Sequence, residues 1–293
     1  MTRGTIRVVD AADRTREPGR RARRGRRRAP VVLVVPAVVG GLLVVLPLAG
    51  LVQRAPWSDL WALLGTEAVR EALRLSLLTS TVATVVSVAL GVPLAWVLAR
   101  VAFPGRRVAR ALVTLPMVLP PVVGGAALLL ALGRRGLVGQ YLDQWFGIVL
   151  PFSTAGVVVA ETFVAMPFLV VTVEAAFRAA DRRYEDAAAT LGARPWTVFR
   201  RVTLPAVRPA LVAGAVLCWA RALGEFGATI TFAGNLQGRT QTMPLAVFVT
   251  RESDRGAAIA LSLVMVAISL AVLVGLRDRW LATGGDAPTG DRP

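Results

Sequence analysis

Four ionisable side chains interrupt long apolar stretches of this chain, and they have the types and spacing that chemistry in a membrane would need. Glu161 and Glu174 lie in one stretch, and Arg221 and Glu225 lie in another. Arg221 and Glu225 are four residues apart, so they share one helical face and can pair, with Glu161 as a candidate cross-span partner. Because a charge at membrane depth costs about 2.5–3.5 kcal/mol on insertion scales, these three residues form either a structural ion pair or a polar lining for an anion pathway. Glu174 lies near the end of its stretch, where its carboxylate can extend to the membrane surface, and it needs no special role.

The residue types that are missing exclude several classes of protein. The chain has no histidine and no lysine, so its 34 basic residues are all arginine, and Cys218 is its only cysteine. Without histidine there is no Ser-His-Asp triad, HExxH zinc site or histidine proton relay, and without lysine there is no Walker A phosphate loop. One cysteine forms no intrachain disulfide, and its apolar context predicts that Cys218 packs in the interior. We therefore expect no catalytic residue, no metal ligand and no cofactor, and a protein that is not itself an enzyme.

Length and hydropathy predict a membrane protein. The 293 residues are 55% hydrophobic, with a mean hydropathy of +0.61. A helix needs about 20 apolar residues to cross a bilayer. Six stretches approach that length: 31–52, 72–99, 111–132, 155–176, 209–231 and 257–276. The second is the least clean, because Arg74 and several Ser and Thr residues interrupt it. We predict an all-α, polytopic membrane protein with about six transmembrane helices, which form one transmembrane domain over residues 31–276.

The distribution of arginine predicts the orientation, because short loops rich in Lys and Arg stay in the cytoplasm. Segment 1–30 carries eleven Arg and three acidic residues, a net charge of +8, and segments 99–110 and 177–208 each carry +4. The alternate loops are nearly neutral, with net charges of −1, +1 and +1: 53–71, 133–154 and 232–256. We therefore expect both termini and the two basic loops in the cytoplasm.

The two ends of the chain are expected to be tails. Residues 1–30 have the composition of a disordered, Arg-rich cytoplasmic tail, with nucleic-acid binding or a twin-arginine secretory signal as alternatives. A plain cytoplasmic tail is favoured because the apolar run 31–52 is longer than the about 7–15 residues of the apolar region in a signal peptide. Residues 277–293 form a short tail without net charge. No loop or tail is long enough for a soluble domain with its own core, so energy conversion and ligand capture must come from other chains.

Proline and glycine interrupt two of the apolar stretches. Broken helices at membrane depth are tolerated where they line a cavity or gate, so the third and fifth stretches are candidate pathway walls. The alternative is that these small residues permit close helix packing. The candidate gate or helix-break residues are Pro120, Pro121, Gly124, Gly125, Gly224 and Gly227.

A polar stretch between the fourth and fifth apolar runs, within 177–208, predicts two short helices with a bend. Gly192 suits a left-handed helix cap, Pro195 suits the first turn of the second helix, and Pro205 is expected to end it. An apolar stripe lies beside a basic one: Leu191, Trp196 and Phe199, then Arg194, Arg200 and Arg201. Such a hairpin buries little by itself, so it suits either a partner groove or the lipid headgroups of a membrane surface.

The spacing in this stretch resembles the EAA loop of ABC-importer permeases. The matching residues are Asp186, Ala187, Ala188, Gly192, Val202, Leu204 and Pro205. Asp186 replaces the family's usual Glu, although Glu185 stands beside it. In that family the loop is the coupling helix that docks on a cytoplasmic ATPase. The resemblance therefore implies an ATPase-coupling role for Glu185, Asp186, Ala187, Ala188, Gly192, Trp196, Phe199, Leu204 and Pro205.

Two further stretches, 114–125 and 220–235, look like the molybdate branch of these permeases. The sulfate/thiosulfate branch is similar around Gly224 and Glu225 but usually differs in the residues that follow. Together with the EAA loop, the resemblance covers approximately residues 72–276. It implies an importer of molybdate or tungstate, with sulfate or thiosulfate as the alternative.

The resemblance also implies partners and a location. Two copies of the chain would form the pore, two ATP-binding subunits would grip the coupling loop, and an extracytoplasmic protein would deliver the oxyanion. The complex would lie in the lipid bilayer of the cell inner membrane and would bind no nucleic acid. An ion-coupled carrier is a less favoured class, because no internal repeat is visible in the sequence.

Overall fold

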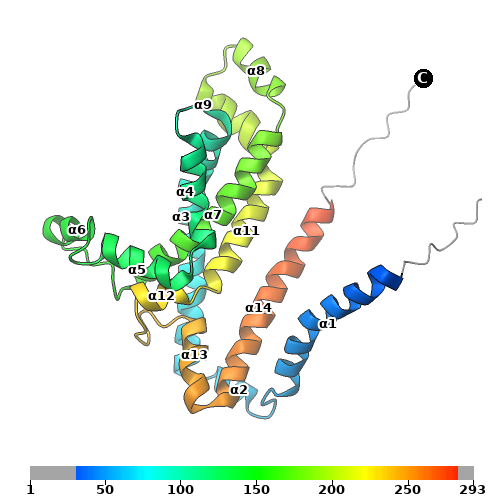
Figure 1. The fold of residues 1–293 in the computed structure, drawn as a ribbon, viewed down its shortest axis with the longest axis vertical. Helices are drawn as coiled ribbons and strands as arrows, with labels where there is room; N and C mark the ends of the chain where they lie inside the picture. Colours follow the sequence, from blue (N-terminus) through cyan, green and yellow to red (C-terminus); the bar gives the residue numbers. More distant parts are fainter. Residues whose placement is uncertain (1–30, 283–293) are drawn as a thin grey trace, which may run out of the picture. The chain divides into compact units, whose positions relative to one another are not determined.

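The computed structural model describes residues 31–282, so the expected tail at 1–30 and the last residues of the expected tail at 277–293 lie outside the described residues. Every regular element within 31–282 is a helix, as predicted (Figure 1). The chain divides into two units at Leu48, and each is described by itself. Helix α1 (Val31–Gln53) belongs mostly to the first unit and agrees with the predicted span 31–52. Its 23 residues extend about 35 Å, enough to cross the hydrocarbon core.

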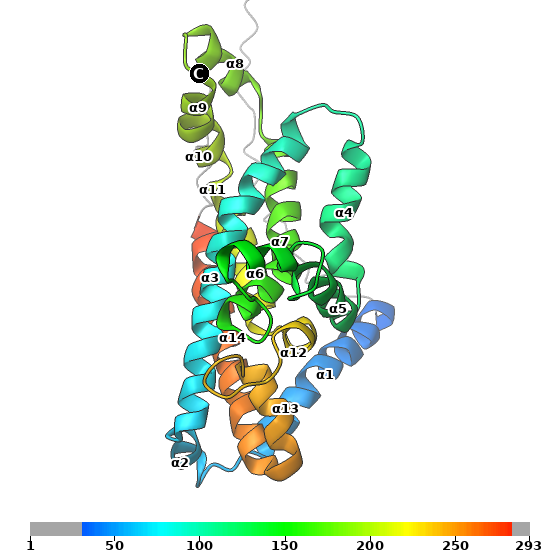
Figure 2. The same ribbon diagram turned by 90° about the vertical axis from the view of Figure 1, so that its left-hand side faces the viewer.

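Three helices run side by side in the second unit and form its core (Figures 1 and 2). They are α3 (Glu67–Arg100), α7 (Thr154–Ala179) and α11 (Arg208–Leu223). The core between them contains Leu98, Leu169, Phe177 and the predicted interior cysteine, Cys218. The predicted spans 72–99 and 155–176 are confirmed, and both helices are longer than expected at their ends.

The third predicted span, 111–132, is not one straight helix. The helical axis bends by 119° between helix α4 (Arg106–Val118) and helix α5 (Pro121–Leu132). Pro120 and Pro121 lack backbone N–H groups, and Leu119 before them is extended, so the helix ends there as the sequence predicted. The predicted start at 111 was wrong, because Gly105, with φ of 81°, ends the preceding loop and α4 begins at Arg106.

The fifth and sixth predicted spans also differ at their boundaries. Helix α11 ends at Leu223, three residues follow, and α12 (Gly227–Phe232) resumes, so the span predicted at 209–231 is broken. Helix α14 (Arg255–Ala282) extends six residues past the predicted end of the sixth span. Among the residues described, four helices are long and apolar enough to cross a membrane, or six if each of two bent pairs is one span.

Three short helices were not predicted, and all lie in the nearly neutral loops: α2 (Leu60–Leu64), α6 (Gly139–Phe146) and α13 (Met243–Ser253). Helices α2 and α13 lie at one end of the α3–α7–α11 core, and the polar hairpin between α7 and α11 lies at the other (Figures 1 and 2). Met243 and Ala246 of α13 pack with Ala72 of α3 and Leu261 of α14. The second unit therefore has a basic, polar end and an opposite end of short connecting helices.

Candidate functional site

The hairpin between α7 and α11 consists of α8 (Arg183–Thr190), α9 (Pro195–Val198), a π-helical turn (Phe199–Thr203) and α10 (Leu204–Ala206). Gly192 has φ of 82°, and its N–H bonds the carbonyl of Ala189 at 2.9 Å, which confirms the predicted left-handed cap. Pro195 begins α9, also as predicted. Pro205 was expected to end the helix, and the stop lies one residue later. Helix α10 continues the helical run that starts at Pro195, and the run ends at Ala206.

The aromatic residues of the hairpin divide into an inner and an outer set. Phe199 is half-buried, and its ring centroid lies 6.0 Å from that of Trp96 on α3 and 6.5 Å from that of Phe177 on α7. Trp196 stacks on the outer side of Phe199 at 5.6 Å and is 68% exposed, while Leu191 is 88% exposed. The predicted apolar stripe is therefore split: Leu191 and Trp196 face outward, whereas Phe199 attaches the hairpin to the core.

The adjacent acidic residues, Glu185 and Asp186, have different environments. Glu185 accepts a hydrogen bond of 2.8 Å from Arg100, the last residue of α3, and its side chain is 21% exposed. Asp186 is exposed and makes no ion pair among the described residues. Sequence spacing placed Asp186 at the key acidic position of the loop, and the structure adds that Glu185 is the acid held by the core.

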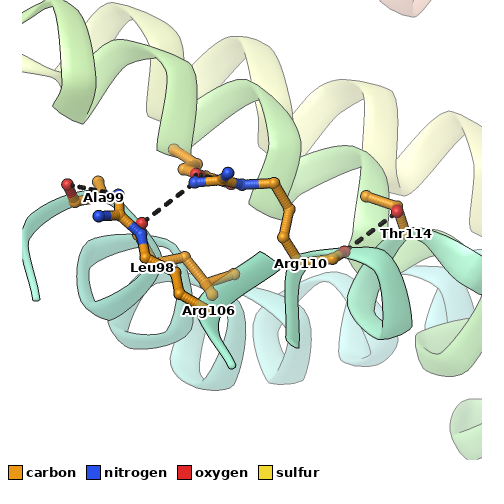
Figure 3. A network of polar contacts seen from close by, with 6 residues as sticks. Leu98, Ala99, Arg106, Arg110 and Thr114 are labelled. Carbon is orange, nitrogen blue, oxygen red and sulfur yellow. Dashed lines mark hydrogen bonds and ion pairs between the residues drawn. The ribbon is translucent and has the colours of Figure 1, made fainter. Parts of the chain in front are cut away.

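Two arginines in the first part of α4 bind the end of α3. Arg106 donates to the carbonyl of Ala99 at 3.0 Å, and Arg110 donates to the carbonyl of Leu98 at 3.4 Å (Figure 3). Arg110 also donates through Nε to Glu174 on α7 at 2.8 Å. These carbonyls have no partner within their own helix, so arginine satisfies the end of α3 and complements its dipole.

Glu174 therefore differs from its prediction. It was expected to extend to the membrane surface, but it is 5% exposed and paired with Arg110, which joins α7 to α4. The two residues are 64 positions apart, so no local pattern could have paired them. The basic composition of 99–110 supplied the only signal.

The charges inside the apolar helices pair as the spacing predicted, with one exception. Arg221 Nη2 lies 2.6 Å from Glu225 Oε2, and the other Glu225 oxygen accepts from the N–H of Ala228 at 2.7 Å in the first turn of α12. Glu161 does not pair with Arg221. It accepts instead from Thr79 Oγ1 of α3 at 2.9 Å. Buried Ser and Thr residues in the first half of α3 made the second predicted span, 72–99, the least apolar in sequence, and that polarity was the signal for a hydrogen-bond partner.

The glycines expected to break helices act in two different ways. Gly124 and Gly125 lie inside a continuous α5 and do not break it, which corrects the prediction. A Cβ at Gly125 would lie 2.7 Å from Thr231 Cβ and 2.8 Å from the Ala228 carbonyl oxygen, both in α12. A Cβ at Gly227 would lie 2.7 Å from Pro121 Cβ. These two glycines therefore permit the close approach of α5 and α12, whereas Gly224 caps the end of α11, where a Cβ would make only an ordinary contact of 3.6 Å with the Ala220 carbonyl oxygen.

Long apolar helices, paired internal charges and an exposed polar hairpin define a multi-pass membrane protein. Residues 87–282 match the family described as "Binding-protein-dependent transport system inner membrane component", and the chain belongs to that family. It is 50% identical over 250 residues to the "Molybdenum transport system permease protein ModB" of Mycobacterium tuberculosis, which covers 85% of this chain and 94% of the relative.

Two more distant matches extend this comparison. The "Sulfate transport system permease protein CysT" of Escherichia coli is 38% identical over 239 residues, 80% of this chain and 86% of that protein. In the crystal structure of a bacterial ABC transporter for the import of alginate, one chain has a similar fold, with a TM-score of 0.71 at 18% identity. That match covers 86% of this chain and 94% of the other.

We predict that Gly125→Ala destabilises the protein by about 1–3 kcal/mol, because the added methyl group meets the backbone of α12 and no side-chain rotation relieves the contact. Gly224→Ala is the matched control, since the nearest atom would be 3.6 Å from its Cβ. Thermal unfolding midpoints in detergent provide the measurement. Equal midpoints for the two variants would contradict the close packing of α5 on α12.

Proposed function

We propose that this chain is the transmembrane subunit of an ATP-driven importer of molybdate. The observation that carries the proposal is the 50% identity to a molybdenum permease over 94% of that relative, against 38% for a sulfate permease. Tungstate is nearly the same as molybdate in size and charge, so it is expected to share the route. Sulfate is the second candidate, and the 38% identity over 80% of this chain is the observation in its favour.

The proposed assembly contains two copies of this chain, two ATP-binding subunits and an extracytoplasmic oxyanion-binding protein in the inner membrane. The exposed Leu191 and Trp196 on the hairpin support a protein partner, since apolar side chains at a polar end of the molecule need cover. Ligand selection belongs mainly to the delivering protein. A dedicated molybdate pocket in this chain is therefore not required.

The hairpin is well placed to transmit the work of an ATPase. It connects α7 to α11 directly, so a displacement of the hairpin acts on both helices. The chain bends by 73° between residues 195–206 and α11. This bend determines the direction in which a displacement of the hairpin acts on the start of α11. Glu185 to Pro205 is the segment proposed to be gripped by the ATP-binding subunit.

For the internal charges, we favour a structural role over a pathway lining. Both oxygens of Glu225 are occupied, one by Arg221 and one by the first turn of α12, and its side chain is 1% exposed. The pair therefore holds the break between α11 and α12. Glu161 similarly joins α7 to α3 through Thr79.

The proposed orientation places the N-terminus, the loop at 99–110, the hairpin and the C-terminus in the cytoplasm. The transmembrane domain is assigned to residues 31–276 and the two ends of the chain to cytoplasmic tails. Support comes from the charge difference between alternate loops, +8, +4 and +4 against −1, +1 and +1.

Substrate and energy source are tested together by uptake in cells that lack their own molybdate importer. We expect radiolabelled molybdate to enter only when this chain is expressed with its ATP-binding subunit and binding protein. Tungstate in excess should abolish the uptake, and sulfate should compete weakly. Uptake that sulfate abolishes and molybdate does not would assign the chain to sulfate, and uptake by the purified chain alone in liposomes would exclude the ABC mechanism.

The hairpin's role is tested by Gly192→Val. A β-branched residue in the left-handed region costs about 1–2 kcal/mol, which corresponds to roughly a tenfold loss of affinity if the partner requires this bend. Gly105→Val is a matched control, because Gly105 has φ of 81° and open space but lies in the other basic loop. Affinity for the ATP-binding subunit, measured in detergent by surface plasmon resonance, should fall for Gly192→Val alone. An equal effect of both substitutions would contradict the coupling role.

Orientation is tested by labelling introduced cysteines with a membrane-impermeant maleimide. Leu191→Cys on the hairpin and Leu137→Cys after α5 are suitable, because these leucines are 88% and 76% exposed. Cys218 is fully buried and contributes little background. In spheroplasts, Leu137→Cys should react and Leu191→Cys should react only after permeabilisation. The reverse pattern would overturn the orientation.

A further inference from the structure

Arg100 joins three elements at the polar end of the molecule. It is the last residue of α3, and its side chain is 7% exposed. Its Nη2 atom donates to Glu185 in the first turn of α8, at 2.8 Å, and to the carbonyl of Ala180 just after α7, at 3.3 Å. One guanidinium group therefore connects the end of α3, the end of α7 and the start of the hairpin.

The second limb of the hairpin returns to the same part of α3. Phe199 contacts Trp96 edge-on, with ring centroids 6.0 Å apart. Trp96 and Arg100 are four residues apart, so they lie on one face of the last turns of α3. The hairpin is thus fixed to α3 at two points, by an ion pair on its entering limb and by an aromatic contact on its leaving limb.

Helix α3 carries these contacts toward the other end of the second unit. Its 34 residues extend about 51 Å. Near its start, Ser76 accepts a hydrogen bond of 2.7 Å from the N–H of Met243, the first residue of α13. Thr79, one turn further on, holds Glu161 of α7. A single helix thus contacts the hairpin at one end and α13 at the other, although neither is its neighbour in sequence.

We propose that Arg100 is a positioning residue that fixes the hairpin to α3, so that a displacement of the hairpin moves α3 as well as the covalently attached α7 and α11. This inference rests on the proposed coupling function of the hairpin. Glu185 then acts inside the chain, as the acceptor for Arg100, and the surface offered to the ATP-binding subunit is made by the exposed residues around Leu191 and Trp196.

Three variants and a control test the inference: Arg100→Gln, Glu185→Ala, the double variant, and Arg107→Gln. Arg107 lies in the first turn of α4, is exposed, and makes no ion pair among the described residues, so its substitution removes the same charge without touching the contact. The first measurement is hydrogen exchange of residues 183–198 in the purified chain, which requires neither substrate nor partner. The second is substrate-stimulated ATP hydrolysis by the complete reconstituted transporter.

Both single variants should raise hydrogen exchange in the hairpin about tenfold and lower stimulated ATP hydrolysis about tenfold, with co-purification of the ATP-binding subunit retained. The double variant should resemble the singles, because two residues that act through one contact give non-additive effects. Arg107→Gln should match the unmodified protein. Multiplied losses in the double variant, unchanged exchange in the singles, or an equal effect of Arg107→Gln would each overturn the inference.

Hydrogen exchange in the purified chain and molybdate uptake by the complete transporter together separate this inference from the proposed function. If the unmodified transporter shows no ATP-dependent molybdate uptake, the proposed function fails, while the exchange data still report whether Arg100 holds the hairpin. If uptake is normal and the exchange of the hairpin is insensitive to Arg100→Gln, only the positioning role fails.

Discussion

The last backbone carbonyls of a helix have no partner within that helix and need a donor from elsewhere, which can be a side chain or water. Here the donors at the polar end are arginines. Arg106 and Arg110 bind the last carbonyls of α3, and Arg100 binds the carbonyl that follows α7. Two of these arginines also hold a carboxylate, Glu174 or Glu185, and so connect helices that are distant in sequence. The residues that give the loops their positive charge therefore also hold the helices together.

The sequence predicted the parts of this fold that depend on short-range chemistry. Apolar length located the spans, the proline pair at 120–121 located the break between α4 and α5, and Gly192 located the bend in the hairpin. Each of these is set within a few residues by backbone restrictions or by the thickness of a bilayer. The pairing of Arg221 with Glu225 was predictable for the same reason, since one helical turn separates them.

Long-range pairing was not predictable in this way. Thr79 and Glu161 are 82 positions apart, and Arg100 and Glu185 are 85 apart, so their contacts depend on how α3 and α7 align. Glycine presented a similar ambiguity. Gly125 and Gly224 look equivalent in sequence, but only the first lies against another helix backbone. Glycine is used both to end a helix and to let two helices approach closely. The sequence shows glycine in either case, and only the atoms around each glycine in the structure tell the two roles apart.

The π-helical turn at Phe199–Thr203 places one extra residue in the second half of the hairpin. A turn closed by i→i+5 hydrogen bonds holds one residue more than an α-helical turn, and such turns are found as single insertions in helices. Leu204 closes the turn by donating to the carbonyl of Phe199, and Pro205 follows it directly. A regular α-helix would require an N–H at Pro205 for the carbonyl of Arg201, and the proline ring would meet that carbonyl. The wider turn accommodates Pro205 while Phe199 keeps its contact with Trp96, so a proline sets the rotational offset between the hairpin and α11.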